Sequence, residues 1–281
     1  QPPGDQPTAD RGGEGGDLQA LLEKNGSTFN GSHEKAARLC MDKYATGQTI
    51  ETMHDPFISS AKKKLFATSD LLNHAPKDLH DLWDKLVKDL GSAALSVKPQ
   101  GDGCSAGIVK LSSAEELAIY LDLIRRGAPC IPAGTFLGQS AIIEMPSTRN
   151  SNLLFENFIV TDKLSTQGSE LVFEKKTGWI ELTIGIRESG GTYHALNPSI
   201  TVAEGHVLSL EEKFQGGTGV NITPPPKEIV PPPLLTETKT RMERVAKTLG
   251  IQNYTRIDFF LNVTNGRIIV IEANTLPGLT P

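Results

Sequence analysis

Cysteine, excess basic charge and long apolar segments are all scarce in this sequence. The three cysteines, Cys40, Cys104 and Cys130, are widely spaced and odd in number, which excludes a disulfide scaffold and a tetrathiolate zinc site and favours a reducing compartment. No run reaches the roughly 18–20 apolar residues that a membrane-spanning helix requires. Acidic residues outnumber basic ones, 33 to 28, so a broad basic surface for nucleic acid is not expected. We therefore expect a soluble protein with no nucleic-acid or membrane partner.

The N-terminal segment also lacks recognisable features. Its first 17 residues are rich in Pro, Gly and charge, without the apolar core of a secretory signal or the Arg- and Ser-rich pattern of a transit peptide. The sequence has no initiating Met and stops directly after a predicted strand, so we interpret it as an internal fragment. Its 281 residues, 38% of them hydrophobic, are still enough to bury a core.

Periodicity predicts helices and strands in mixed order. Apolar residues at helical spacing, with a capping box that starts at Ser113 and a C-terminal glycine at Gly250, predict helices at 18–24, 33–46, 76–90, from 113 onward and at 235–249. Alternation predicts strands at 93–98, 107–110, 179–186, 254–261 and 267–273. The turn Thr264-Asn265-Gly266 predicts that the last two strands form a hairpin, and the polar stretch 161–178 is expected to be an insertion loop. This mixture indicates α+β layers rather than regular βαβ alternation.

The first segment suited to chemistry runs from Val97 to Gly107. A strand ends there in Lys98 and three glycines follow, so backbone N–H groups can approach a phosphate closely while the lysine supplies a positive charge. The segment is not a P-loop, because the Gly-Lys-Ser/Thr ending is missing. Taken alone, a segment of this kind is more often a surface hairpin turn.

The second segment is the predicted C-terminal hairpin. Alternation places Arg256 with Asp258 on one face of their strand, and Glu272 with Asn274 on one face of theirs. Pairing across the turn would bring Asp258 near the other two, which makes an oxygen-rich site suited to magnesium beside an arginine that could neutralise phosphate or an oxyanion. The alternative is a solvated sheet face with a cross-strand Arg–carboxylate pair.

The third segment, from Leu208 to Gly219, is rich in glycine and contains Lys213. A segment of this kind could close over a substrate as a lid, and the alternative is an ordinary loop.

In this order, these segments resemble the ATP-grasp ligases, and within them the D-alanine–D-alanine ligase family. The resemblance covers nearly the whole chain from about Gly12 and is carried by five stretches: GGEGGDLQALLEKNGSTFNGSHEKAARLCMDK, VKPQGDGCSAG, LLFENFI, SLEEKFQGGTG and RIDFFLNVTNGRIIVIEANTLPGLTP. They resemble, in turn, the end of the family's first domain, its phosphate loop, its hinge between ATP-binding lobes, its omega loop and its RID…EANTxPGMT signature. The run EEKFQGGTGVNITPPP most resembles plastid-type eukaryotic members.

The resemblance implies an α+β ATP-grasp fold of two α+β lobes, preceded by the tail of an α/β preATP-grasp domain. Residues 1–42 would be the remnant of that first domain, residues 43–155 the central lobe, and residues 156–281 the C-terminal lobe with the omega loop and the metal site. The implied activity is ATP-dependent joining of two D-alanines through an acyl phosphate, for peptidoglycan precursors. A homodimer in a plastid or the cytoplasm would be typical.

The resemblance also implies roles for individual residues, each of which has a plain surface charge or polar group as its alternative. The implied set is Lys43 and Lys98 on the ATP phosphates, Cys104 and Ser105 in the phosphate loop, Glu156 on adenine, Glu181 on ribose, Lys213 on the γ-phosphate, Asp258, Glu272 and Asn274 on two magnesium or manganese ions, and Arg256 on the oxyanion.

Two positions depart from the family pattern. Cys104 stands where the family has Ser, and Phe214 stands where the family has Tyr. Phe214 lacks the phenolic O–H of Tyr, so the second-substrate site loses a hydrogen-bond donor. Phe214 is therefore expected to affect acceptor specificity, with D-lactate as the alternative acceptor to D-alanine. Another carboxylate ligase and a non-catalytic nucleotide-binding protein are the remaining alternatives.

Overall fold

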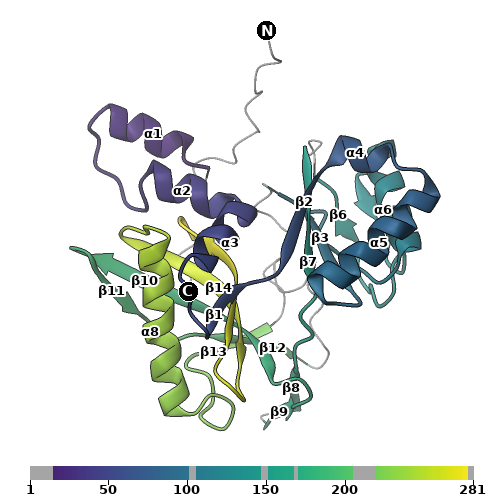
Figure 1. Cartoon of the computed structure of the whole chain (residues 1–281). Helices are drawn as coiled ribbons and strands as arrows, with labels where there is room; N and C mark the ends of the chain where they lie inside the picture. The colour runs from purple at the N-terminus through teal and green to yellow at the C-terminus, as the bar shows by residue number, and fades with distance from the viewer. Residues whose placement is uncertain (1–14, 101–105, 147–150, 168–169, 205–218, 278–281) are drawn as a thin grey trace.

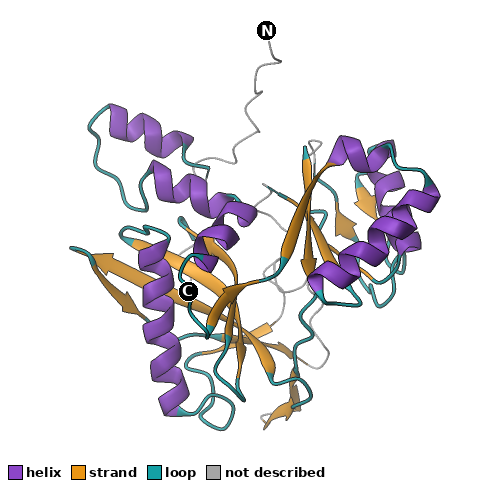
Figure 2. Ribbon diagram, viewed as in Figure 1, coloured by secondary structure: helices purple, strands orange, loops and turns teal. Residues whose placement is uncertain are grey.

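The computed structural model describes residues 15–100, 106–146, 151–167, 170–204 and 219–277. Figure 1 shows this part of the chain as two α+β lobes side by side, with a pair of helices from the N-terminal end above the larger lobe. In each lobe, helices lie against a β-sheet (Figure 2). Within the described ranges, no helix combines the length and the apolar character needed to cross a membrane.

The larger lobe is built on a five-stranded sheet. Its strands, in spatial order, are β1 (Ile58–Ser60), β15 (Ile268–Asn274), β14 (Tyr254–Asn262), β10 (Trp179–Ser189) and β11 (Thr192–Ala195). Only the β1–β15 pair is parallel. Helix α8 (Pro232–Thr248) buries Met242 and Val245 in the same core as Ile257 and Phe259 of the sheet. Three short helices precede the sheet: α1 (Asp17–Lys24), α2 (Glu34–Met41) and α3 (Lys43–Glu51).

The smaller lobe has its own core. Its sheet has the order β2 (Lys63–Ala67), β7 (Asn152–Asn157), β3 (Leu95–Pro99) and β4 (Val109–Leu111), antiparallel throughout. The fully buried side chains of Leu95, Phe155, Leu117 and Tyr120 show how the sheet and its helices pack together. The helices and minor strands of this lobe are α4 (Thr68–Leu72), α5 (Pro76–Leu90), α6 (Ala114–Arg126), β5 (Cys130–Ile131) and β6 (Ile143–Glu144).

The capping signals are confirmed. Ser113 Oγ accepts the N–H of Glu116, and the Glu116 carboxylate in turn accepts the N–H of Ser112, one residue earlier than a standard capping box. Gly250 adopts a left-handed φ of 71° directly after helix α8 and its C-cap. These local signals place helices α6 and α8 where the sequence predicts them.

The prediction of one helix over 33–46 is wrong. The structure has two helices, α2 and α3, separated at Asp42, whose ψ of 98° is not helical. The Asp42 carboxylate accepts the N–H groups of Tyr44 and Ala45 and so caps a new helix that starts at Lys43. Because the helical spacing of apolar residues continues through Asp42, the sequence pattern does not reveal the break between the two helices.

The prediction of a loop over 161–178 is also wrong. This stretch contains β8 (Lys163–Gln167) and β9 (Glu170–Glu174), which join β12 (Ile200–Glu204) and β13 (Gly219–Ile222) in a separate four-stranded sheet. Its polar composition is compatible with a strand pair, and its residues Leu164 and Phe173 pack against the core of the larger lobe.

A β-bulge in β15 decides which face its polar residues occupy. Asp258 pairs with Glu272 while the next residue, Phe259, pairs with Val270, so Ile271 is the extra residue. Without the bulge, Glu272 would share the core face with Val270, because side chains alternate along a strand. The bulge places Glu272 on the opposite face and lets Ala273 enter the core.

Candidate active site

Two carboxylates meet at the centre of the five-stranded sheet. Asp258 of β14 and Glu272 of β15 are directly opposite each other, and the Asn274 amide donates to Asp258 Oδ2 at 3.2 Å and to Glu272 Oε1 at 3.5 Å. Arg256 Nη2 donates to Asp258 Oδ2 at 3.0 Å, and Thr183 Oγ1 of β10 donates to Asp258 Oδ1 at 2.5 Å. The predicted hairpin and the predicted convergence of these residues are therefore confirmed.

The two carboxylates have opposite pKa shifts. Burial, reinforced by the charge of Glu272, raises the pKa of Asp258 despite the attraction of Arg256 and the hydrogen bond from Thr183. Burial also acts to raise the pKa of Glu272, but the positive charges of Lys43 and Lys98 outweigh it, and the pKa is lowered. Negative charge is therefore compensated at Glu272 but only partly at Asp258.

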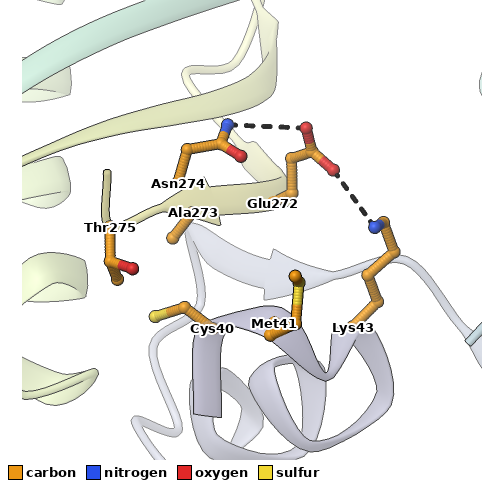
Figure 3. Close-up of a pocket in the computed structure, with 7 residues that line it drawn as sticks. All are labelled: Cys40, Met41, Lys43, Glu272, Ala273, Asn274 and Thr275. Carbon is orange, nitrogen blue, oxygen red and sulfur yellow. Dashed lines mark hydrogen bonds and ion pairs between the residues drawn. The ribbon is translucent and has the colours of Figure 1, made fainter. Parts of the chain in front are cut away.

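Lys43 approaches this pair from the adjacent helix. The side chain is 7% exposed, and its Nζ lies 3.5 Å from Glu272 Oε2 (Figure 3). Its position follows from the Asp42 cap, because Lys43 is the first residue of α3. Cys40, Met41 and Lys43 line a small cavity together with Glu272, Ala273, Asn274 and Thr275 (Figure 3).

A second buried charge cluster lies in the smaller lobe. Glu156 of β7 pairs with Lys98 of β3 at 2.6 Å and with Lys63 of β2 at 2.9 Å, and all three side chains are at most 8% exposed. Burial acts to raise the pKa of Glu156, but Lys98 and Lys63 together hold it below its ordinary value. Because Lys98 also lowers the pKa of Glu272, this cluster and the carboxylate pair are electrostatically connected.

The arrangement suits a ligand that carries anionic oxygens and a hard cation. Two lysines supply positive charge for phosphate, and two carboxylates with an Asn side chain supply the oxygen donors that magnesium prefers. The charge of Asp258, which Arg256 compensates only in part, fits a bound cation. Among the described residues, no three His, Cys, Asp or Glu side chains are grouped so that they could hold a metal ion, so this candidate depends on the Asn274 amide as its third donor.

Comparisons with known sequences agree with this chemistry. Residues 154–281 match the family model described as D-ala D-ala ligase C-terminus. The chain is 27% identical to the vancomycin C-type resistance protein of Enterococcus gallinarum, over 95% of this chain and 62% of that protein. It is 25% identical to D-alanine–D-alanine ligase A of Pseudomonas putida, over 96% and 61% of the two chains. The chain thus spans less than two thirds of the length of these curated relatives.

Solved structures settle the fold. D-alanyl-alanine synthetase A from Vibrio cholerae superimposes with a TM-score of 0.63 at 20% identity, over 96% of this chain and 66% of that chain. D-alanine–D-alanine ligase from Bacillus anthracis complexed with ATP gives 0.61 at 19% identity, over 95% and 66%. This chain has the ATP-grasp fold of D-alanine–D-alanine ligases. The predicted fold class is confirmed.

The ATP-grasp fold brings most of the predicted residues to one region. One unbroken chain of contacts runs from Lys43 through Glu272, Asn274 and Asp258 to Arg256, and Lys98 is coupled to Glu272 by charge. Glu181 lies on β10 opposite Phe260, two residues before Thr183. Both oxygens of Glu156 pair with lysines, so its predicted contact with adenine would have to share or displace one of them.

Four predicted residues, Cys104, Ser105, Lys213 and Phe214, lie outside the described residues. Two others were missed by the sequence analysis. Lys63 lies in a run of three lysines that resembles a solvated surface, and Thr183 lacks the charge that drew attention to its neighbours. The alternation of β10, which places Thr183 on the same face as Glu181, is the signal that could have found it.

Proposed function

We propose that this chain is the nucleotide-binding and catalytic part of an ATP-dependent D-alanine–D-alanine ligase. The observation that carries the proposal is the convergence of Lys43 and Lys98 on the carboxylate pair Asp258–Glu272. The similarity to ligases, one of them solved with ATP, supports this use of the site. Lys43 and Lys98 would bind the phosphates of ATP, with Glu156 and Glu181 near the adenosine.

Asp258, Glu272 and Asn274 would hold magnesium, with two ions as the proposed number. When bound, the metal neutralises phosphate charge and orients the transferred group. Arg256 is anchored to Asp258 with a side chain 41% exposed, so its guanidinium can also reach a substrate oxyanion. Lys213, Cys104 and Ser105 are proposed to contact the phosphates from the two glycine-rich segments.

The proposed reaction has two balanced steps. The carboxylate oxygen of the first D-alanine attacks the γ-phosphorus of ATP, the bond to the β-phosphate oxygen breaks, and ADP and D-alanyl phosphate form. The amine of the second D-alanine then attacks the acyl carbon, loses a proton, and inorganic phosphate leaves the tetrahedral intermediate. Lys43 and Lys98 stabilise the phosphate charge, and Arg256 stabilises the oxyanion.

We also propose finer points of identity. The motif EEKFQGGTGVNITPPP supports a plastid-type member that acts in a plastid or the cytoplasm, with a homodimer as its assembly. Phe214 supports D-lactate as a second acceptor, in which case an ester replaces the amide.

The first test is thermal stabilisation by Mg-ATP. A ligand that binds only the folded state raises the melting temperature. At a ligand concentration of 100 times Kd, the free energy of unfolding increases by about 2.7 kcal/mol. We expect a magnesium-dependent rise that Glu272→Ala abolishes. Glu174→Ala is the matched control, because its carboxylate lies on β9 in an exposed pair with Lys176. No rise in a folded wild-type chain would contradict the proposal.

Product analysis then separates the alternatives. With D-alanine, the proposal expects ADP, phosphate and the dipeptide in equal amounts. An ester formed with D-lactate would identify a depsipeptide ligase. ATP binding without any product from either acceptor would support a non-catalytic nucleotide-binding protein instead.

A further inference from the structure

Lys63 is a buried lysine to which the proposed reaction assigns no role. Its side chain is 8% exposed, although the neighbouring Lys64 is 50% exposed and pairs with Asp89 at 3.6 Å. Burial, together with the nearby charges of Lys98 and Lys43, lowers the pKa of Lys63 despite its pair with Glu156. An apolar side chain of similar size would avoid this repulsion, so packing alone does not explain a lysine here.

The contacts of Lys63 link both proposed phosphate-binding lysines. Its Nζ pairs with Glu156 Oε1 at 2.9 Å, and the other oxygen of Glu156 pairs with Lys98 at 2.6 Å. The same Nζ donates to the backbone carbonyl of Lys43 at 3.0 Å, at the first residue of α3. One ammonium group therefore fixes the partner of Lys98 and the backbone that carries Lys43.

Lys63 also lies where the chain crosses between the two lobes. The first crossing runs from β1 of the larger sheet to β2 of the smaller one, and Lys63 is the first residue of β2. The carbonyl of the preceding residue, Lys62, accepts the N–H of Asn157, where β7 ends and the chain returns toward the larger lobe. The two crossings are thus joined beside Lys63, and a contact there affects how the lobes align.

Helix α3 provides the space that Lys63 occupies. Gly47 is in the interior of this helix, where glycine is a poor helix former. A Cβ at Gly47 would lie 2.8 Å from both Cε and Nζ of Lys63 and 2.6 Å from Ser60 Oγ. Real Cβ atoms do not approach other atoms so closely, so any larger residue would displace both the end of the lysine and the Ser60 hydroxyl.

We propose that Lys63 is a positioning residue that holds Lys43 and Lys98 in register for the phosphates of one nucleotide. This inference rests on the proposed function. Lys63 acts through Glu156 and the backbone of Lys43, and it does not contact the nucleotide itself. Lys98 belongs to the smaller lobe and Lys43 packs against the larger one, so a residue bonded to both sides keeps the phosphate site assembled across the junction.

The test compares Mg-ATP affinity with stability. Lys63→Met removes the ammonium group but leaves the Glu156–Lys98 pair neutral, so no unpaired charge is created. We expect the Kd for Mg-ATP, measured by calorimetry on the full 281-residue chain, to rise roughly tenfold. Lys64→Met is the matched control and should leave the Kd within about twofold of wild type, as expected for an exposed pair.

Two further variants separate positioning from general destabilisation. Gly47→Ala keeps every charge and improves helix propensity, yet it displaces Lys63, and it should weaken Mg-ATP binding in the same way. Leu86→Val removes a buried methylene group from helix α5 in the core of the smaller lobe, and it should lower the melting temperature without changing the Kd.

The outcomes are distinct. A wild-type chain that does not bind Mg-ATP would overturn the proposed function. A wild-type chain that binds it, with Lys63→Met or Gly47→Ala unchanged in Kd, would overturn the role of Lys63 and leave the function intact. A Kd that rises equally in Leu86→Val would show that lost stability is the cause, and would also overturn the positioning role. If Lys63→Met fails to fold, Gly47→Ala decides the question.

Discussion

Replacement of Glu156 by glutamine tests whether burial controls the strength of the charge cluster. Glu156 has two cationic partners, at 2.6 and 2.9 Å, and all three side chains are at most 8% exposed. Glu156→Gln leaves two ammonium groups in the interior without a counter-charge. Removal of one partner from a buried ion pair costs about 3–5 kcal/mol, and we expect a loss of unfolding free energy in this range.

The chain contains a matched control for this substitution. Asp122 on α6 also has two cationic partners, Arg126 at 2.6 Å and Arg125 at 3.7 Å, but these side chains are 46–65% exposed. Because water screens exposed charges, Asp122→Asn should cost less than about 1 kcal/mol. The two substitutions therefore differ mainly in burial.

Urea denaturation followed by circular dichroism measures both variants. The fold holds the pKa of Glu156 below its ordinary value of 4.5, so the ionised carboxylate stabilises the fold above that pH. This contribution is lost as the pH falls through the lowered pKa, and the difference between wild type and Glu156→Gln should then shrink. Equal losses for Glu156→Gln and Asp122→Asn at pH 7 would refute the argument from burial.

Three other substitutions or reactions give separate tests. Since the pKa of Asp258 is raised, its ionised form disfavours folding at pH 7. Asp258→Asn should therefore unfold at no lower urea concentration than wild type, although it should lose its stabilisation by Mg-ATP. A clear loss of stability in urea would contradict this. Tyr120 donates to the carbonyl of Gly107 at 2.7 Å in the core, so Tyr120→Phe should cost about 1–3 kcal/mol in the same assay, and no cost would show that the carbonyl finds another donor. Burial raises the pKa of Cys40 to about 12, so iodoacetamide at pH 8 should label it only after unfolding, as peptide mapping can check; rapid labelling of the native chain would disprove its burial.

The predicted features that the structure confirms are set by local interactions. Alternation in β14 and β15, with Asn265-Gly266 between them, predicts a hairpin that brings Asp258 opposite Glu272, as found. The cap at Ser113 likewise depends on residues within a few positions. Such features can be predicted from the sequence because the hydrogen bonds or side-chain periods that produce them lie within one short segment.

Other features depend on which distant segments become neighbours. The sequence places Lys63, Lys98 and Glu156 far apart, and only the strand order β2–β7–β3 brings them together and buries them. The extra residue at Ile271 has no local signature, since Ile268 to Ile271 is a uniform apolar run. The break at Asp42 is similarly hidden, because an aspartate within a helical period can either point to solvent or cap a new helix.

The sequence by itself therefore determined the chemical groups of this protein: the lysines, the carboxylates, the hairpin that pairs Asp258 with Glu272, and the motifs shared with ligases. The tertiary structure alone decided their electrostatic state. Burial and the arrangement of neighbouring strands raise the pKa of Asp258 and lower that of Glu156. They also place Lys63, one lysine in a charged run, in contact with both Glu156 and the backbone of Lys43. The physical reason is that charge interactions depend on distance and on exclusion of water, and the fold fixes both.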